Sequence, residues 1–242
     1  ADQHITNIDS YREAGIPYAR THDSSACNSY GGEHTVDVHR IFKNFDADEN
    51  DPASYDFAFT DLFLSEMVKK GIEPFYRLGT TIENFHNVKA YHIYPPKDFA
   101  KWARVCEHII MHYNEGWANG FHMDIEYWEI WNEPDNEPTI EDNPCWKGTK
   151  EQFFELYRVA SIYLKEKFPH LKIGGYASCG FYALTNTFIQ TANSSPRMEY
   201  FLEFFEAFLD YSQKNDCVID FFSWHSYASV KKNPIYAQHA RE

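Results

Sequence analysis

Residues 127–138 read YWEIWNEPDNEP, and this stretch decides how the rest of the chain is interpreted. Trp128 and Trp131 are typical of a buried strand, and Pro134, which has no backbone N–H to donate to a sheet, predicts where the strand ends. Glu133 therefore stands at the C-terminal end of an apolar strand, the edge at which a parallel α/β barrel carries its active site. Burial there disfavours the charged carboxylate, so we expect the pKa of Glu133 to rise from about 4.3 toward about 6 or above. An isolated Asn-Glu-Pro is more typical of a surface turn, but the apolar WEIW before it favours a functional Glu133.

Strand-like runs alternate with amphipathic helices along the chain, which is typical of a parallel sheet covered by helices. The expected strands lie at residues 15–22, 72–79, 125–133, 171–178 and 219–227. Apolar side chains at helical spacing predict helices at residues 5–14, 59–67, 99–113, 153–164 and 201–208. Thr149 and Gln152 form a capping-box pattern before one of these helices. Residues 23–51 are expected to form a long polar loop.

The strand count leaves two α/β architectures open. A closed (β/α)₈ TIM barrel needs eight strands and about 250 residues, whereas five strands also fit an open doubly wound sheet. Polar or small residues stand at the end of every expected strand, which favours a barrel in which these ends converge on one mouth. These residues are Arg20 and His22, Gly79 and Thr80, Asn132 and Glu133, Ser178, and His225 and Tyr227. We therefore predict a single barrel domain over residues 1–242 that lacks the first strand and the last two strands. The rest of the polypeptide or another chain would supply these strands.

Composition narrows the partners of the chain. A net charge of -14 over 242 residues argues against nucleic acid and anionic membrane, because both attract a basic surface. Neither a membrane span nor a signal peptide is recognisable, so we expect a soluble protein, either cytoplasmic or exported. Aromatic residues make up 18% of the chain, which suits sugar rings because their C–H faces pack on flat aromatic surfaces.

The sequence predicts no catalytic metal and no cofactor. His108 and His112 are four residues apart, but the pattern lacks the Glu of a zinc-protease helix, so exposed histidines are expected. Residues 46–51 resemble the start of a calcium loop but lack its glycine. The five cysteines are odd in number and without metal-ligand spacing, which indicates mostly free thiols in packing positions.

WNEP at one strand end, with R-T-H at an earlier strand end and W-H-S-Y at a later one, resembles the retaining glycoside hydrolases of clan A. The resemblance is closest to glycoside hydrolase family 39, which holds β-xylosidases and α-L-iduronidases. It covers most of the chain, through GIPYARTH, DFAFTDLFLSEMVKKGIEPFYRLG, YWEIWNEPD and DFFSWHSY. It implies a TIM barrel that hydrolyses a β-linked glycoside, a β-xyloside first of all, by double displacement on a carbohydrate substrate.

The resemblance also implies roles for particular residues. Glu133 matches the general acid/base, and Asn132 matches the residue that binds the sugar 2-hydroxyl. Regular strand alternation would place these two neighbours on opposite faces, so a local irregularity is required if both reach one sugar.

Further matches concern substrate binding. His22 matches a sugar-hydroxyl ligand, and His225 and Tyr227 match a pair in which the tyrosine orients the nucleophile. Arg20 could hold that nucleophile ionised, although an ion pair inside the barrel is nearly as well supported. A platform for the sugar ring could come from Trp131, Trp146 and Trp224.

The chain departs from the family pattern at the nucleophile, which the family carries as a second Glu on the seventh strand. Glu129 lies two pleats deeper than Glu133 and is expected to be a buried, hydrogen-bonded barrel residue. Glu242 carries little weight, and the simplest interpretation of Asp135, Glu137 and Glu141 is solvated loop acids. A non-catalytic carbohydrate-binding or scaffold protein on a truncated barrel thus remains the alternative. A metal-dependent sugar isomerase is less favoured because its carboxylate and histidine cluster is missing.

Overall fold

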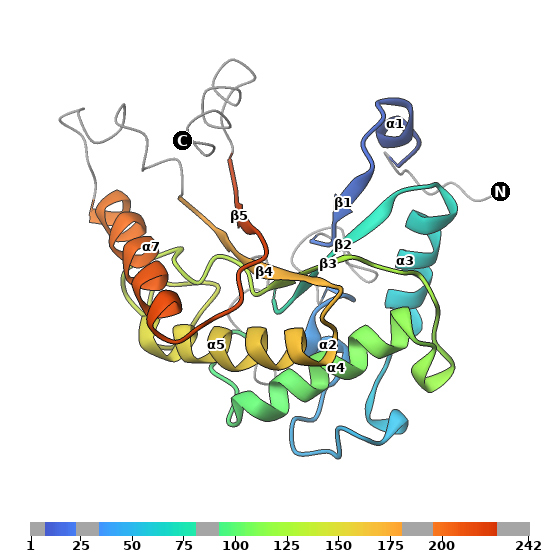
Figure 1. The fold of residues 1–242 in the computed structure, drawn as a ribbon, viewed down its shortest axis with the longest axis horizontal. Coiled ribbons are helices and arrows are strands. Elements are labelled where there is room, and N and C mark those ends of the chain that lie inside the picture. Colours follow the sequence, from blue (N-terminus) through green and yellow to red (C-terminus); the bar gives the residue numbers. More distant parts are fainter. Residues whose placement is uncertain (1–7, 23–33, 81–91, 181–195, 227–242) are drawn as a thin grey trace.

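The computed structural model describes residues 8–22, 34–80, 92–180 and 196–226 (Figure 1). Of the residues singled out from the sequence, Tyr227, Cys27 and Glu242 lie outside these ranges, as do residues 23–33 of the expected polar loop.

The described strands form one parallel sheet. These strands are β1 (Tyr18–Arg20), β2 (Glu73–Leu78), β3 (Tyr127–Ile130), β4 (Lys172–Ser178) and β5 (Phe222–Trp224). Each strand pairs in parallel with the next one along the chain, so their spatial order equals their sequence order. A doubly wound sheet would reverse this order at a switch point, whereas a barrel wall keeps it. The sheet is therefore part of a (β/α)₈ barrel, as the sequence predicted.

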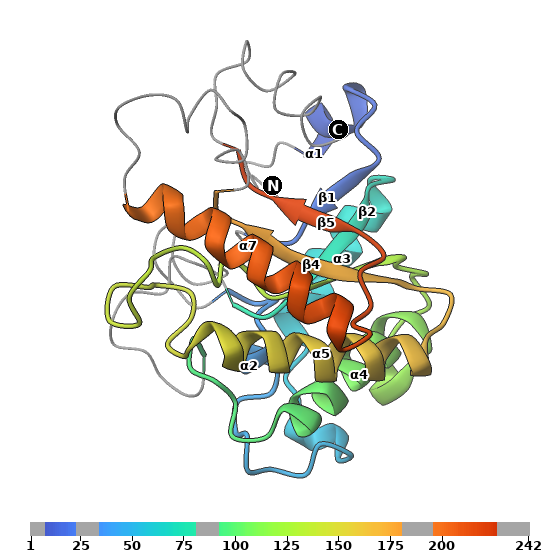
Figure 2. The ribbon, with the colours of Figure 1, turned by 60° about the vertical axis from the view of Figure 1, so that its left-hand side comes forward.

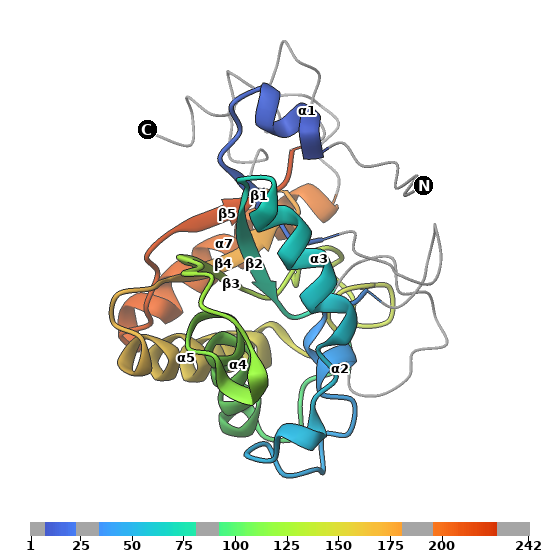
Figure 3. The ribbon, with the colours of Figure 1, turned by 90° about the vertical axis from the view of Figure 1, so that its right-hand side faces the viewer.

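Helices cover one side of this sheet in an arc (Figure 1). The longer ones are α3 (Ala58–Lys69), α4 (Phe99–Asn114), α5 (Lys150–Lys167) and α7 (Pro196–Lys214). Helices α5 and α7 pack side by side near β4 (Figure 2), and α3 lies against β2 (Figure 3). The shorter helices are α1 (Ile8–Glu13), α2 (Val38–Ile41), η1 (Pro52–Ser54) and η2 (Trp117–Asn119). No helix in the described ranges is long and apolar enough to cross a membrane.

Local signals explain where the helices begin. The expected capping box opens α5, because the Thr149 hydroxyl accepts from the Gln152 backbone and the Gln152 side chain accepts from the Thr149 backbone. Asp98 caps α4 by accepting from the backbone N–H of Lys101.

Strand alternation gives the sheet two different faces. Trp128 and Ile130 of β3 are fully buried, and the Trp128 ring stacks on Tyr76 of β2 at 4.8 Å between centroids. On the opposite face, Tyr127 stacks on Phe75 at 5.4 Å. This opposite face is the interior of the barrel, and Glu129 belongs to it through the same alternation.

Two expectations about the loop after β1 and about helix α4 are wrong. The described part of the supposed polar loop contains α2 and buries Val36, Val38, Ile41, Phe42 and Phe45. These apolar residues are scattered among charges, so no regular period reveals them. His108 and His112 are buried rather than exposed, with 8% and 2% of their surface accessible.

His112 is buried because the Phe57 ring stacks on it at 3.6 Å and Asp61 bonds its Nε2 at 3.0 Å.

Candidate active site

The backbone changes direction directly after β3. Trp131 has φ 72° and Glu133 has φ 47°, both in the left-handed region that non-glycine residues rarely adopt. The segment is held in this form because the Trp131 N–H donates to the Leu78 carbonyl at 2.6 Å and the Glu133 N–H donates to the Ala177 carbonyl at 3.2 Å. Residues in such strained conformations cluster at functional sites. The irregularity required for Asn132 and Glu133 to act together is present.

Both oxygens of the Glu133 carboxyl group have hydrogen-bonding partners. Oε1 is bonded to Nδ1 of His225, and Oε2 accepts from Nδ2 of Asn136 at 2.7 Å. Glu133 is 3% exposed, and His225 is itself fixed by a bond from its backbone N–H to the Ser178 carbonyl at 2.9 Å. The exits of β3, β4 and β5 thus converge on one carboxyl group.

This environment sets the protonation of Glu133. Burial by itself raises the pKa of Glu133, but the hydrogen bond and charge of His225, together with the Asn136 bond, lower it below its usual value. The expected rise in pKa is therefore wrong. Burial was foreseen correctly, whereas the imidazole partner comes from 92 positions further along the chain.

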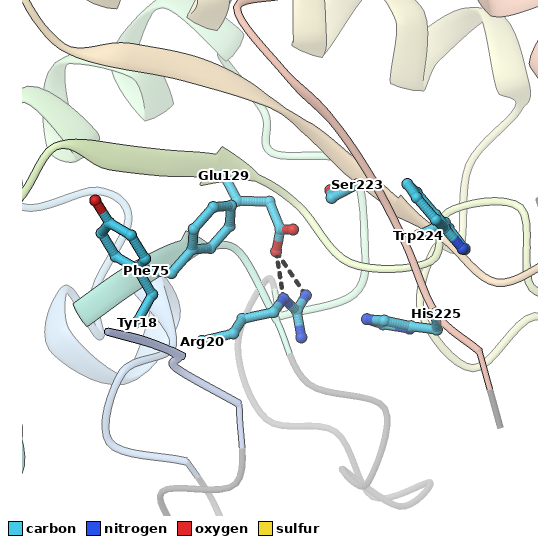
Figure 4. A pocket seen from close by; sticks show the side chains of 7 residues that line it. All are labelled: Tyr18, Arg20, Phe75, Glu129, Ser223, Trp224 and His225. Atoms are coloured by element: carbon cyan, nitrogen blue, oxygen red, sulfur yellow. Dashed lines mark hydrogen bonds and ion pairs between the residues drawn. The ribbon is translucent and has the colours of Figure 1, made fainter. Parts of the chain in front are cut away.

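Arg20 connects the other candidate residues. Its Nε donates to Glu129 Oε2 at 2.7 Å and its Nη2 donates to Asn132 Oδ1 at 2.8 Å. Figure 4 shows the guanidinium directed at Glu129 across the barrel interior. The ion pair considered for Arg20 is present, and Glu129 is the buried, hydrogen-bonded residue that was expected, with 0% exposure. Asn132, also fully buried, is thereby held beside Glu133.

Arg20 also defines the tautomer of His22. Its Nη1 lies 3.1 Å from Nδ1 of His22. Because a guanidinium can only donate, Nδ1 accepts and the proton of the neutral ring lies on Nε2. Burial, followed by the charges of Arg77 and Arg20, lowers the pKa of His22 to about 2. His22 is thus a neutral ring with an N–H donor, and its ring centroid is 6.1 Å from that of His225.

A cavity of about 270 Å³ lies on the inner face of the sheet (Figure 4). Its lining combines charged groups with aromatic rings and comprises Tyr18, Arg20, Phe75, Glu129, Ser223, Trp224 and His225. Of the three candidate platform tryptophans, Trp224 lines it. Trp131 and Trp146 are only 1% and 2% exposed, and the Trp131 indole donates to the Cys145 carbonyl at 3.0 Å. Their burial favours a packing role.

Sequence reasoning missed part of the site. Asp135, expected to be solvated, is fully buried and accepts from the Ser178 hydroxyl at 2.6 Å and from the Cys179 backbone at 3.0 Å. Burial raises the pKa of Asp135 to about 7. Asn136 and its partner Arg197 were not singled out either; a polar turn directly after WNEP is the signal that could have indicated Asn136.

The cysteines behave as expected in the described ranges, where Cys106 and Cys145 are buried free thiols. Among the residues that the structure describes, one group could bring metal ligands together: Asp37, His39 and His92, whose ligand atoms all lie within 4.8 Å of one another. Asp37 already forms an ion pair with the fully buried Arg77, so the group offers a dication no net negative charge.

The fold and the site together define a class: a parallel β/α barrel with a buried carboxylic acid at a strand exit. Comparison with known proteins gives the family. The sequence profile of glycosyl hydrolases family 39 matches residues 10–240, and the chain belongs to this family.

Individual relatives agree with the family assignment. A β-xylosidase from Caldicellulosiruptor saccharolyticus is 25% identical over 223 residues, which cover 89% of this chain and 37% of that protein. The crystal structure of a glucosidase from Croceicoccus marinus is similar with a TM-score of 0.64 and 27% identity, over 92% of this chain and 40% of that one. A family 39 enzyme from Xanthomonas axonopodis pv. citri shares the fold with a TM-score of 0.55 and 20% identity, over 90% of this chain and 36% of that one. The chain thus spans about two fifths of the length of these relatives.

Proposed function

We propose that the protein containing this chain is a retaining glycoside hydrolase that cleaves a β-linked glycoside, a β-xyloside first of all, with Glu133 as general acid/base. The observation that carries the proposal is the position of Glu133. Its carboxyl group is buried at a barrel strand exit, beside Asn132 and in direct contact with His225. Membership of family 39 and the similarity to a β-xylosidase support the reaction and the substrate.

In the first step, a nucleophilic carboxylate attacks the anomeric carbon while Glu133 transfers its proton to the departing glycosidic oxygen. In the second step, Glu133, now a carboxylate, removes a proton from water as the water breaks the glycosyl ester. In this proposal the first proton is the one that Glu133 and His225 share. That proton lies in the hydrogen bond between Nδ1 of His225 and Oε1 of Glu133.

Double displacement requires a second carboxylate about 5 to 5.5 Å from the first. Glu129 is the acid that lines the cavity, and its ion pair with Arg20 already engages it. We therefore propose that the nucleophile comes from further barrel strands, supplied by the rest of the polypeptide or by another chain. Tyr227, outside the described residues, stays a proposed partner of that nucleophile.

The remaining proposed contacts suit a neutral sugar. His22 offers an N–H donor, Asn132 an amide, and Trp224 an aromatic ring beside the cavity. Arg20 is proposed to act on substrate binding through Asn132, whose amide oxygen it holds. Trp131 keeps only the role of supporting the strand exit.

The proposal is tested with Glu133→Ala in the natural polypeptide. Aryl β-xylosides with good leaving groups need little protonation, so they should still form the covalent intermediate, while substrates with poor leaving groups should not react. Azide, which needs no general base, should restore turnover and yield the β-glycosyl azide. Equal loss on both kinds of substrate, without azide rescue, would remove Glu133 from the acid/base role.

A second candidate function is a non-catalytic carbohydrate-binding protein. The observation that favours it is the ion pair between Arg20 and Glu129, which engages that carboxylate. Calorimetric binding of xylose oligomers by the natural polypeptide, without release of reducing sugar, would favour that candidate.

A further inference from the structure

Arg197, near the start of α7, holds Asn136 at two points. Its Nε donates to the Asn136 backbone carbonyl at 2.7 Å, and its Nη2 donates to Asn136 Oδ1 at 3.0 Å. The same guanidinium forms an ion pair with Glu137 at 2.9 Å. Arg197 and Asn136 are 61 positions apart, so α7 fixes a turn that belongs to the exit of β3.

The chemistry of arginine decides how the Asn136 amide is oriented. An asparagine amide presents an acceptor oxygen on one side and a donor NH₂ group on the other. Because a guanidinium has only donors, the amide oxygen must face Arg197. The NH₂ group then faces Glu133, where it donates to Oε2 at 2.7 Å.

This orientation makes the two oxygens of Glu133 different. Oε2 accepts an N–H, which stabilises the ionised carboxylate, while Oε1 is the oxygen bonded to His225. We propose that Arg197 is a positioning residue for Glu133: by orienting the Asn136 amide it keeps Oε2 as an acceptor and assigns the catalytic proton to Oε1. This inference rests on the proposed acid/base role of Glu133.

The test is the pH profile of kcat/KM for an aryl β-xyloside with Arg197→Met in the natural polypeptide. The alkaline limb of that profile reports loss of the proton from the acid/base group. Without Arg197 the amide is free to turn, the donor to Oε2 is lost and the pKa of Glu133 rises. The limb should move to higher pH by about half a unit to one unit. Arg197→Lys, which keeps the charge but donates from a single nitrogen instead of a planar fork, should move it less.

A double-mutant cycle separates an effect of Arg197 that acts through the Asn136 amide from the simple loss of the Arg197 charge. Asn136→Ala should shift the limb in the same direction, and Arg197→Met added to it should produce no further shift. Glu137→Gln removes the ion-pair partner of Arg197 and serves as the matched control, with an unchanged limb. Additive shifts, or a lower kcat with an unshifted limb, would overturn the inference.

A second readout does not depend on turnover. In protein labelled with ¹³C at glutamate carboxyl groups, and with the Glu133 signal assigned through Glu133→Gln, Arg197→Met should raise the titration midpoint of Glu133. If the wild-type polypeptide hydrolyses no glycoside, the proposed function fails, while this titration still decides the orienting role of Arg197. An unshifted midpoint in the variant would contradict that role.

Discussion

His225 and Glu133, from the exits of β5 and β3, share a hydrogen bond between Nδ1 and Oε1, and this bond opposes the effect of burial on the carboxyl group. His225→Phe keeps a ring of similar size but removes the bond. Burial then acts with less opposition, so the pKa of Glu133 should rise and the alkaline limb of kcat/KM should move upward by about one unit or more. His170→Phe, at an exposed position, is the control. An unmoved limb in His225→Phe would mean that the bond does not govern the protonation of Glu133.

Asp135 should make stability depend on pH in the direction opposite to that of most carboxylates. Its pKa is raised from 3.8 to about 7, so the folded protein binds a proton that the unfolded chain releases. The resulting stabilisation is fully present below pH 3.8 and is lost as the pH rises through about 7.

Asp135→Asn does not titrate, so it should not show this loss. Between acidic and alkaline pH, the unfolding free energy of the wild type should fall by on the order of 4 kcal/mol more than that of Asp135→Asn. Denaturation in urea across a pH series measures it, with Asp210→Asn, an exposed partner of Lys214, as control. Parallel pH curves for Asp135→Asn and wild type would contradict the expectation.

The ion pair between Arg20 and Glu129 should matter more for stability than pairs on the surface. Glu129→Gln leaves the guanidinium without its counter-charge inside the barrel. Because 21% of the Arg20 side chain remains exposed, we expect a loss of about 2 to 3 kcal/mol, below the range for fully buried pairs. The matched control is Glu155→Gln, whose pair with Arg158 is more exposed and should cost under about 1 kcal/mol. Similar losses of unfolding free energy in both variants would show that the interior pair contributes no more to stability than the surface pair.

Gly79 tests how tightly the exit of β3 is packed. A Cβ at Gly79 would lie 2.9 Å from Cα of Trp131, whereas a Cβ at Gly71 would meet nothing within 4 Å. Both glycines have positive φ, 143° for Gly79 and 75° for Gly71, so both substitutions strain the backbone, but only Gly79→Ala adds the clash. The free energy of unfolding of Gly79→Ala should be about 2 kcal/mol lower than that of Gly71→Ala. The clash should also displace Glu133 and thereby lower kcat. Equal melting curves would contradict this.

Much of the fold could be predicted because its signals are local. Apolar runs marked all five described strands, and the pair Thr149 and Gln152 marked the start of α5. The position of Glu133 at a strand exit followed from Pro134 and the tryptophans before it.

What the sequence did not reveal depends on contacts between distant segments. Periodicity carries no information about which imidazole will reach Glu133, and His225 reverses the expected pKa shift. Asp135 looked like a loop acid because its partners Ser178 and Cys179 belong to the neighbouring strand exit. His112 looked exposed because Phe57 and Asp61, which cover it, lie on the far side of β2 in the sequence.

The left-handed backbone at Trp131 and Glu133 also implies a conflict between folding and activity. Each such residue costs of order 1 kcal/mol, and the surrounding bonds to Leu78 and Ala177 must outweigh that cost. Substitutions that relax this turn, such as glycine at position 133, would remove that strain and lose the acid with it. Selection for thermal stability alone would therefore tend to erase the site, so a thermostable variant of this barrel should be sought by changing helices far from the exit of β3.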